Sequence, residues 1–163
     1  MNHARNRQVS ITAVSPGETG TLVNLLQLYQ YDFSEIEPVP VGADGRFHQL
    51  DDVPFEYAYF VHDNGELAGF VLVDRRPSHV IDGQTVWSMV EFFILRKHRR
   101  ASVGATAAHL VIERHSGTWE ITETPHNVAA LSFWRQVLAV YPCEELSYDH
   151  PRHGRCPLQR FSV

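Results

Sequence analysis

A basic segment in front of a glycine is the feature of this sequence best suited to chemistry. Arg96-Lys97-His98-Arg99-Arg100 follows a long apolar stretch, and Gly104 stands at the start of a segment with helical periodicity. The N-terminus of a helix leaves backbone N–H groups without partners and carries a partial positive charge. Arginines in front of such an end make a site for an anion, and the spacing suits a pyrophosphate. The alternative is a solvated basic turn, because short basic motifs also occur without a ligand.

Glu91 is the candidate general base. It lies in the middle of the apolar segment 85–95, between Val90 and Phe92. Burial in such a strand would raise the pKa of its carboxyl group toward the range in which a base works near neutral pH. The alternative is an exposed position on the sheet, or a carboxylate that is neutralised by an arginine.

Aromatic and acidic residues are concentrated after the first predicted helix. Tyr29, Tyr31, Asp32, Phe33 and Glu35 fall within a few residues of one another. Aromatic rings together with carboxylates suit a cationic amine. The alternative places Tyr29 on the apolar stripe of the helix and Phe33 in the core, with the two acids capping the helix or solvated.

The elements that must position these residues follow from periodicity and turn signals. We expect strands at 8–14, 56–62, 66–74, 85–95 and 118–122, two more within 142–163, and helices from 15, 103 and 127. The segment 38–54 is rich in Pro, Gly and Asp and is expected to be a functional loop. This order predicts an α/β fold with a mixed sheet covered by helices, in one domain spanning 1–163.

The amino-acid composition argues against some classes of binding partner. The net charge of −5 argues against a nucleic-acid binder, which needs a basic face. No apolar run approaches the roughly 20 residues of a membrane span, and residues 1–10 lack the apolar core of a secretory signal. With only Cys143 and Cys156, we expect a cytoplasmic protein with reduced thiols.

Two motifs resemble a known family. The segment Arg99-Arg100-Ala101-Ser102-Val103-Gly104 resembles the acyl-CoA pyrophosphate loop of GCN5-related N-acetyltransferases (GNAT), with Ser102 where the first glycine is expected. Residues Asn127, Ala130, Phe133 and Trp134 resemble the family's Asn-x-x-Ala-x-x-Phe-aromatic helix. The segments 31–35, 91–93 and 133–137 also resemble a subgroup of predicted acetyltransferases without an assigned substrate. The resemblance covers nearly the whole chain and is weakest at 39–54.

The resemblance implies a fold and an activity. The fold would be a GNAT-like mixed, mostly antiparallel sheet of about seven strands flanked by helices, splayed between strands 4 and 5. Acetyl-CoA would be the cosubstrate, without a metal, and a small-molecule or peptide amine would attack it directly in a ternary complex. Dimers are common among relatives, so a homodimer is possible.

The resemblance also assigns residues to each part of the site. Backbone groups of Phe93 and Leu95 would bind the pantetheine arm, and an N–H near Phe93 or Ile94 would stabilise the thioester oxygen as charge develops. The cofactor residues it implies are Phe93, Ile94, Leu95, Arg99, Arg100, Ala101, Ser102, Val103, Gly104, Ala105, Asn127, Ala130, Phe133 and Trp134. The acceptor residues it implies are Tyr29, Tyr31, Asp32 and Glu35. Trp134 stands where many relatives carry an acidic tyrosine, which leaves Tyr141 and Tyr31 as candidates for a general acid.

Three other functions compete with this interpretation. Cys143, His150, His153 and Cys156 are potential zinc ligands, although their spacing matches no common zinc pattern. Either cysteine is a potential covalent acetyl carrier. A domain of the same fold can also sense acyl-CoA without catalysis, an alternative that Ser102 and Trp134 keep open.

Overall fold

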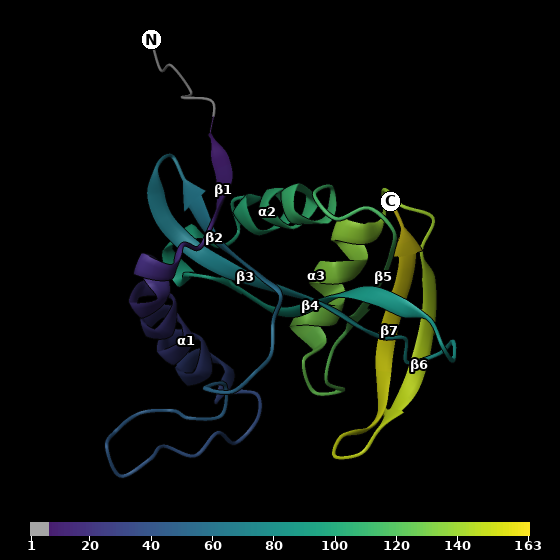
Figure 1. The fold of residues 1–163 in the computed structure, drawn as a ribbon, viewed down its shortest axis with the longest axis horizontal. Coiled ribbons are helices and arrows are strands. Elements are labelled where there is room, and N and C mark those ends of the chain that lie inside the picture. Colours follow the sequence, from purple (N-terminus) through teal and green to yellow (C-terminus); the bar gives the residue numbers. More distant parts are fainter. Residues whose placement is uncertain (1–6) are drawn as a thin grey trace.

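The computed structural model describes residues 7–163, which form one seven-stranded sheet with helices on both faces (Figure 1). The strands are β1 (Val9–Ala13), β2 (Tyr57–Asp63), β3 (Glu66–Pro77), β4 (Thr85–Ile94), β5 (Thr118–Thr122), β6 (Glu144–His150) and β7 (Gly154–Ser162). The helices are α1 (Thr19–Phe33), α2 (Val103–Ile112) and α3 (Val128–Leu138), with short 3₁₀ turns at Pro16–Glu18 and Arg96–His98. The strand order is β1-β2-β3-β4-β5-β7-β6, and the expected mixed sheet is confirmed.

The sheet separates between β4 and β5, the one parallel pair among its neighbouring strands. These two strands pair only at Trp87 with Trp119 and at Ser88 with Glu120, whereas β4 runs on to Ile94. A bulge in the pairing of β3 with β4, between Leu72 and Val73, adds local twist at the same level. The rest of β4 therefore has a free edge, as the predicted splay requires.

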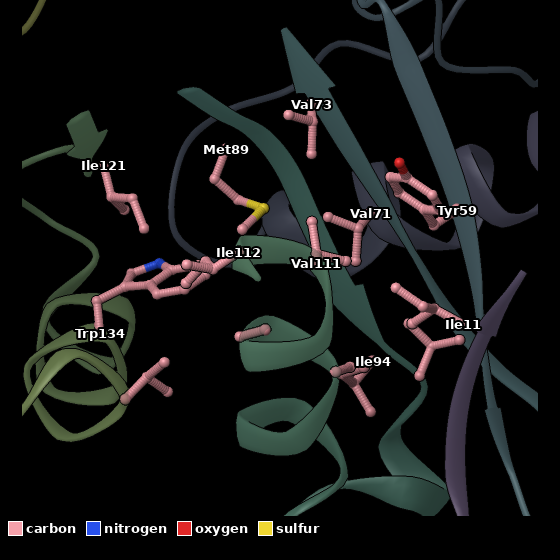
Figure 2. Close-up of a cluster of buried hydrophobic side chains, with 14 of the residues drawn as sticks. Ile11, Tyr59, Val71, Val73, Met89, Ile94, Val111, Ile112, Ile121 and Trp134 are labelled. Carbon is pink, nitrogen blue, oxygen red and sulfur yellow. The ribbon is translucent and has the colours of Figure 1, made fainter. Parts of the chain in front are cut away.

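The two faces of the sheet bury separate cores, because successive side chains of a strand point to opposite sides. On one face, α2 and α3 pack on β1 to β5 and β7, and Figure 2 shows Val71, Met89 and Ile94 of the sheet close to Val111 and Ile112 of α2. On the other face, α1 packs on the sheet through a second cluster. Its buried members are Leu22, Leu25, Phe60, Phe70, Leu72 and Phe93.

The segment between α1 and β2 is a long loop, as predicted, with one isolated bridge between Val41 and Phe47. The side chain of Gln27 in α1 holds this loop with two hydrogen bonds. Its Nε2 donates to Phe47 O (2.8 Å), and its Oε1 accepts from Phe47 N (2.9 Å). The loop is thus tied to the helix that ends beside the splay.

Some predicted bounds were wrong by a few residues. β3 runs three residues past the predicted end, to Pro77, because its pairing with β4 continues that far. The helix expected from residue 15 begins with a 3₁₀ turn, which a capping box closes: Ser15 N–H donates to Glu18 Oε2 (3.0 Å). None of the helices in the part of the chain that the structure describes is long and apolar enough to cross a membrane.

Candidate active site

A cavity of about 680 Å³ lies where β4 and β5 separate, and residues of α3 and of the end of α1 line it. Its volume falls within the ordinary range of small-molecule sites. It is lined by Tyr29, Asp32, Phe33, Ile36, Phe92, Phe93, Ile94, Arg99, Arg100, Ser102, Gly104, Ala105, Asn127, Ala129, Ala130, Phe133, Trp134 and Gln136. The fold therefore brings the basic loop, the Asn127 helix and the α1 aromatics to one site.

The start of α2 offers backbone donors to this cavity. The first hydrogen bond of the helix runs from Thr106 N–H to Ser102 O (2.9 Å). Within residues 7–163, the N–H groups of Val103, Gly104 and Ala105 have no backbone acceptor, and Ser102 supplies no side-chain cap. Free N–H groups at a helix N-terminus bind anions such as a diphosphate.

Gly104 permits α2 and α3 to approach each other at this point. A Cβ atom on Gly104 would lie 3.3 Å from Cε2 of Phe133 and 3.6 Å from Cγ1 of Ile94. Any larger side chain would move Phe133 or fill the cavity that both residues line.

The two predicted phosphate arginines differ in their surroundings. Arg99 donates from Nε to Ile94 O (2.7 Å) and from Nη2 to Asp32 Oδ2 (2.5 Å). Arg96 donates from Nε to Asp32 Oδ1 (2.7 Å). Arg100 forms no ion pair with any residue in the described range 7–163. The positive charge left for a ligand phosphate is therefore mainly that of Arg100.

Asp32 consequently joins α1 to the basic loop. Burial raises the pKa of its carboxyl group, but the hydrogen bonds from Arg99 and Arg96 outweigh burial, and the net shift is downward. We predicted Asp32 as an acceptor contact; it does line the cavity, and both of its oxygens also accept hydrogen bonds from arginines of the basic loop.

Ser102 adopts the left-handed conformation, with φ at 62°, as does Arg100 at 60°. This conformation is free of strain for glycine and costs a residue with a side chain about 1–3 kcal/mol. The serine in place of the motif glycine therefore leaves strain in the loop that faces the cavity.

Ser102→Gly is expected to stabilise the fold by about 1 kcal/mol by releasing this strain. That corresponds to a rise of about 2–4 °C in the melting temperature for a chain of this size. Thermal unfolding measures it, with Ser10→Gly in the extended β1 strand as a control that should lower the melting temperature. If the melting temperature of Ser102→Gly were unchanged or lower, the claim that the backbone is strained at Ser102 would be wrong.

Glu91 lies on β4 opposite Leu72 and faces the α1 layer, on the same side of the sheet as Phe93. Burial raises the pKa of its carboxyl group to about 7, although a hydrogen bond from Tyr29 and the charge of Arg76 lower it in part. Glu91 does not itself line the cavity, whereas Tyr29 does. Glu91 thus neighbours Tyr29, a residue of the cavity lining, and not the cavity itself.

The free edge of β4 presents a different set of backbone groups from the one predicted. Leu95 N–H donates to Ala68 O (2.8 Å), and the Phe93 carbonyl lies against Gly69 of β3. Because backbone groups alternate along an antiparallel pair, those that face the splay belong to Phe92 and Ile94. The predicted roles of Phe93 and Leu95 move by one residue.

The structure separates several other predicted residues from the cavity. Leu95 and Val103 pack in the two cores, and Ala101 is half-buried beside α2. Tyr31 is 68% exposed, and the Glu35 side chain is 83% exposed at 3.9 Å from Arg96. None of these five side chains lines the cavity; for Val103, only the free backbone N–H at the start of α2 remains as a donor.

Sequence reasoning missed Glu123, a buried carboxyl group directly after β5. It is only 7% exposed, and burial raises its pKa to about 7, with a partly opposing hydrogen bond from Gln159. When the Gln159 amide nitrogen faces it, that nitrogen donates to Glu123 Oε1 at 2.7 Å. The sequence did indicate that Glu123 is buried, because Glu123 continues the alternation of Trp119 and Ile121 on the buried face of β5.

Glu123→Gln is expected to stabilise the protein at pH 8 by about 1–2 kcal/mol and to change little at pH 4.5. The folded pKa lies above the unfolded one, so the folded state binds more protons between about pH 4.5 and 7. Stability is lost as the pH rises through this window, and the glutamine removes that loss. Urea unfolding at both pH values measures it, with the exposed Glu113→Gln as control. An equal effect of Glu123→Gln on stability at both pH values would contradict the raised pKa of Glu123.

The zinc and covalent alternatives find little support in the geometry. Across the described part of the chain, no three His, Cys, Asp or Glu side chains are placed to hold a metal ion. Cys143 and Cys156 are both free thiols, and neither lines the cavity.

Solved structures of similar fold include several acetyltransferases. Arabidopsis thaliana NAA60 in complex with acetyl-CoA has a TM-score of 0.63 at 14% identity, covering 96% of this chain and 100% of that one. Arabidopsis thaliana Naa50 in complex with the bisubstrate analogue CoA-Ac-MVNAL has a TM-score of 0.59 at 12% identity, with 95% and 99% covered. A chimera of the Vibrio cholerae spermidine N-acetyltransferase SpeG with hSSAT has a TM-score of 0.61 at 11% identity, with 95% of each chain covered. At these identities the likeness shows the fold.

The family is established by sequence. Among curated proteins, none matches this chain. The model of the acetyltransferase (GNAT) family matches residues 22–139, which is well over half of the chain and includes the basic loop and α3. The chain therefore belongs to the acetyltransferase (GNAT) family and is an acyltransferase.

Proposed function

We propose that this protein transfers the acetyl group of acetyl-CoA to a primary amine by direct attack in a ternary complex. The observation that carries the proposal is the cavity in the splay. It joins the free N–H groups of α2 at one end to Tyr29, the hydrogen-bond partner of Glu91, at the other.

The residues present fit the cosubstrate. The N–H groups of Val103, Gly104 and Ala105, with the charge of Arg100, would hold its diphosphate. Backbone groups of Phe92 would bind the pantetheine arm along the free edge of β4, where the Ile94 carbonyl already accepts from Arg99 and the Ile94 N–H is left for the thioester. Bound there, acetyl-CoA supplies an activated thioester, and Ile94 N–H donates to its oxygen as negative charge develops.

Part of the cofactor site is built by α3. The Asn127 side-chain oxygen accepts from Ala130 N–H (3.1 Å) and fixes the start of that helix. Ala130, Phe133 and Trp134 then form an apolar wall opposite β4, where Phe92 packs on both aromatic rings with centroids 5.5 Å and 5.2 Å away. This wall keeps water from the thioester.

The acceptor must lose a proton before it can attack, because alkyl amines are protonated at neutral pH. Glu91, with a pKa of about 7, takes this proton, and the Tyr29 hydroxyl relays it from the cavity. At pH 7 about half of the Glu91 carboxyl groups are ionised and able to do so.

We infer that no side chain is needed as a general acid. Trp134 has no acidic proton near neutral pH. Tyr141 stacks on Phe161 with ring centroids 5.2 Å apart and lies outside the cavity lining, and Tyr31 is exposed. A thiol with a pKa near ~8.5 leaves readily as the thiolate.

The acceptor, the location and the oligomeric state remain proposals. Among the solved structures of similar fold, one holds the bisubstrate analogue CoA-Ac-MVNAL and another is a spermidine N-acetyltransferase chimera, so both peptides and small amines belong in the test. We expect a cytoplasmic protein, because both cysteines are free thiols. A homodimer is tested by light scattering.

Release of coenzyme A thiol over a panel of amines and peptides tests the activity. We expect saturation in both acetyl-CoA and at least one amine, with acetylated amine formed in equal amount. Saturable acetyl-CoA binding without turnover on any acceptor would overturn the proposal in favour of an acyl-CoA sensor.

A further inference from the structure

Glu37 holds a carboxylate oxygen that no group within the described residues 7–163 satisfies. Its Oε1 is buried and has no hydrogen-bond partner within residues 7–163, and its side chain is 17% exposed. Glu37 follows Ile36, which lines the α1 end of the cavity. A buried carboxylate oxygen without a donor destabilises the fold, so the arrangement favours a cationic ligand that would supply the donor.

The nearest basic group to this oxygen comes from the other half of the sheet. His153, in the turn between β6 and β7, places Nδ1 at 3.6 Å from Glu37 Oε1. That distance is too long for a hydrogen bond. The contact nevertheless shows that the α1–β2 loop and the β6–β7 turn meet beside the splay, with Glu37 between them.

Aromatic rings continue from His153 away from Glu37. The ring of His150 lies 4.6 Å from that of His153, Tyr148 lies 6.2 Å from His150, and His79 stacks on Tyr148 at 4.1 Å. These ring contacts fix the turn that carries His153 beside Glu37.

Glu37 also lies within electrostatic reach of Tyr29, which lines the cavity. Burial is the main cause that raises the pKa of Tyr29, and the charges of Glu91 and Glu37 add to it. Two carboxylates from different elements thus act on one hydroxyl group at the acceptor end of the cavity. A monoamine can pair with only one of them.

We propose that the preferred acceptor is a small aliphatic diamine whose second ammonium group binds Glu37. One amino group loses a proton to Glu91 and attacks, while the other stays protonated against Glu37 Oε1. The reaction forms one N–C bond and breaks one C–S bond. Of the two protons that the reacting ammonium loses, one goes to Glu91 and the other ends on the departing thiolate. This inference rests on the proposed acetyl transfer.

The experiment compares chain-matched acceptors. Coenzyme A release is measured with 1,3-diaminopropane to 1,6-diaminohexane and with the n-alkylamines of equal length. We expect kcat/KM for the best diamine to exceed that of its matched monoamine at least ten-fold. Glu37→Gln should abolish this preference, lowering kcat/KM for the diamine about ten-fold while leaving the monoamine unchanged.

Controls separate recognition from folding. Asp52→Asn removes an exposed carboxylate from the same loop and should keep the diamine preference. Glu37→Asp keeps the charge and should retain part of the diamine preference. The affinity of Glu37→Gln for coenzyme A should equal that of the wild type.

The outcomes distinguish this inference from the activity itself. Equal rates on diamines and monoamines, a preference for peptides over diamines, or an equal loss on both amines in Glu37→Gln would overturn the role of Glu37 and leave the acetyl transfer intact. If none of the acceptors is turned over, the proposed function is overturned. In that case calorimetric titration of 1,4-diaminobutane into the coenzyme A complex decides: binding by the wild type but not by Glu37→Gln supports the Glu37 site, and equal results refute it.

Discussion

Glu91→Gln is expected to lower kcat/KM at pH 8 by about 10²–10³-fold, because the amide cannot take a proton from the acceptor. The substitution keeps the size of the side chain and its hydrogen bond with Tyr29. The affinity for coenzyme A, which rests on the α2 end of the cavity, should remain unchanged. A loss confined to kcat/KM for the amine therefore reports the proton transfer rather than a damaged site.

The pH dependence of kcat/KM tests the role of Glu91 as a base independently of the size of the loss at pH 8. Burial raises the pKa of Glu91 to about 7, and only the ionised carboxylate can accept a proton. The ratio of wild-type to Glu91→Gln kcat/KM should therefore rise with pH up to about 7 and level off above it. The ionisation of the amine itself contributes equally to both proteins and cancels in this ratio.

The matched control is Glu113→Gln, an exposed carboxylate at the end of α2, which should keep the wild-type rate and profile. A ratio that stays flat between pH 5.5 and 8.5 would remove Glu91 from the mechanism. It would direct attention to Glu123, the second carboxyl group with a pKa of about 7.

The anion site was predictable from the sequence because its parts are local. Helix periodicity after a basic segment identifies a helix N-terminus, and the free N–H groups follow from helix geometry without tertiary information. Burial of Glu91 was predictable for the same reason, since its neighbours along the strand are apolar. The element order followed from periodicity and turn signals, and the splay followed from the family resemblance.

The contacts across the sheet could not be predicted from local patterns. Asp32 pairs with Arg99 across 67 residues of sequence, and this pairing decides that Asp32 positions the loop. Glu37 and His153 meet only because the two loops converge at the splay.

Local patterns also could not show that backbone groups of Phe92 and Ile94, rather than those of Phe93 and Leu95, face the splay. Which backbone groups face the free edge of β4 depends on the register with β3, and the bulge there is invisible in the hydrophobic pattern. The apolar character of β4 shows that the strand is buried, but it does not reveal the direction in which the peptide groups point.

Gly104→Val is expected to weaken coenzyme A binding at least 100-fold, about 2.7 kcal/mol. Even a Cβ would lie 3.3 Å from Phe133 Cε2, and the two further methyl groups of valine would enter the cavity or displace that ring. The displaced ring belongs to the wall opposite β4, so both the diphosphate end and the pantetheine path are affected. Isothermal titration calorimetry with coenzyme A measures the affinity.

Graded variants show whether the loss comes from this contact. Gly104→Ala requires Phe133 to move by only a few tenths of an ångström, so its affinity should fall between those of the wild type and Gly104→Val. Gly20→Val, in α1, has no atom within 4 Å of its new Cβ and should bind coenzyme A normally. Melting temperatures establish that all three variants are folded. If folded Gly104→Val bound coenzyme A as tightly as the wild type, the cofactor could not lie against the start of α2, because that is where the new side chain stands.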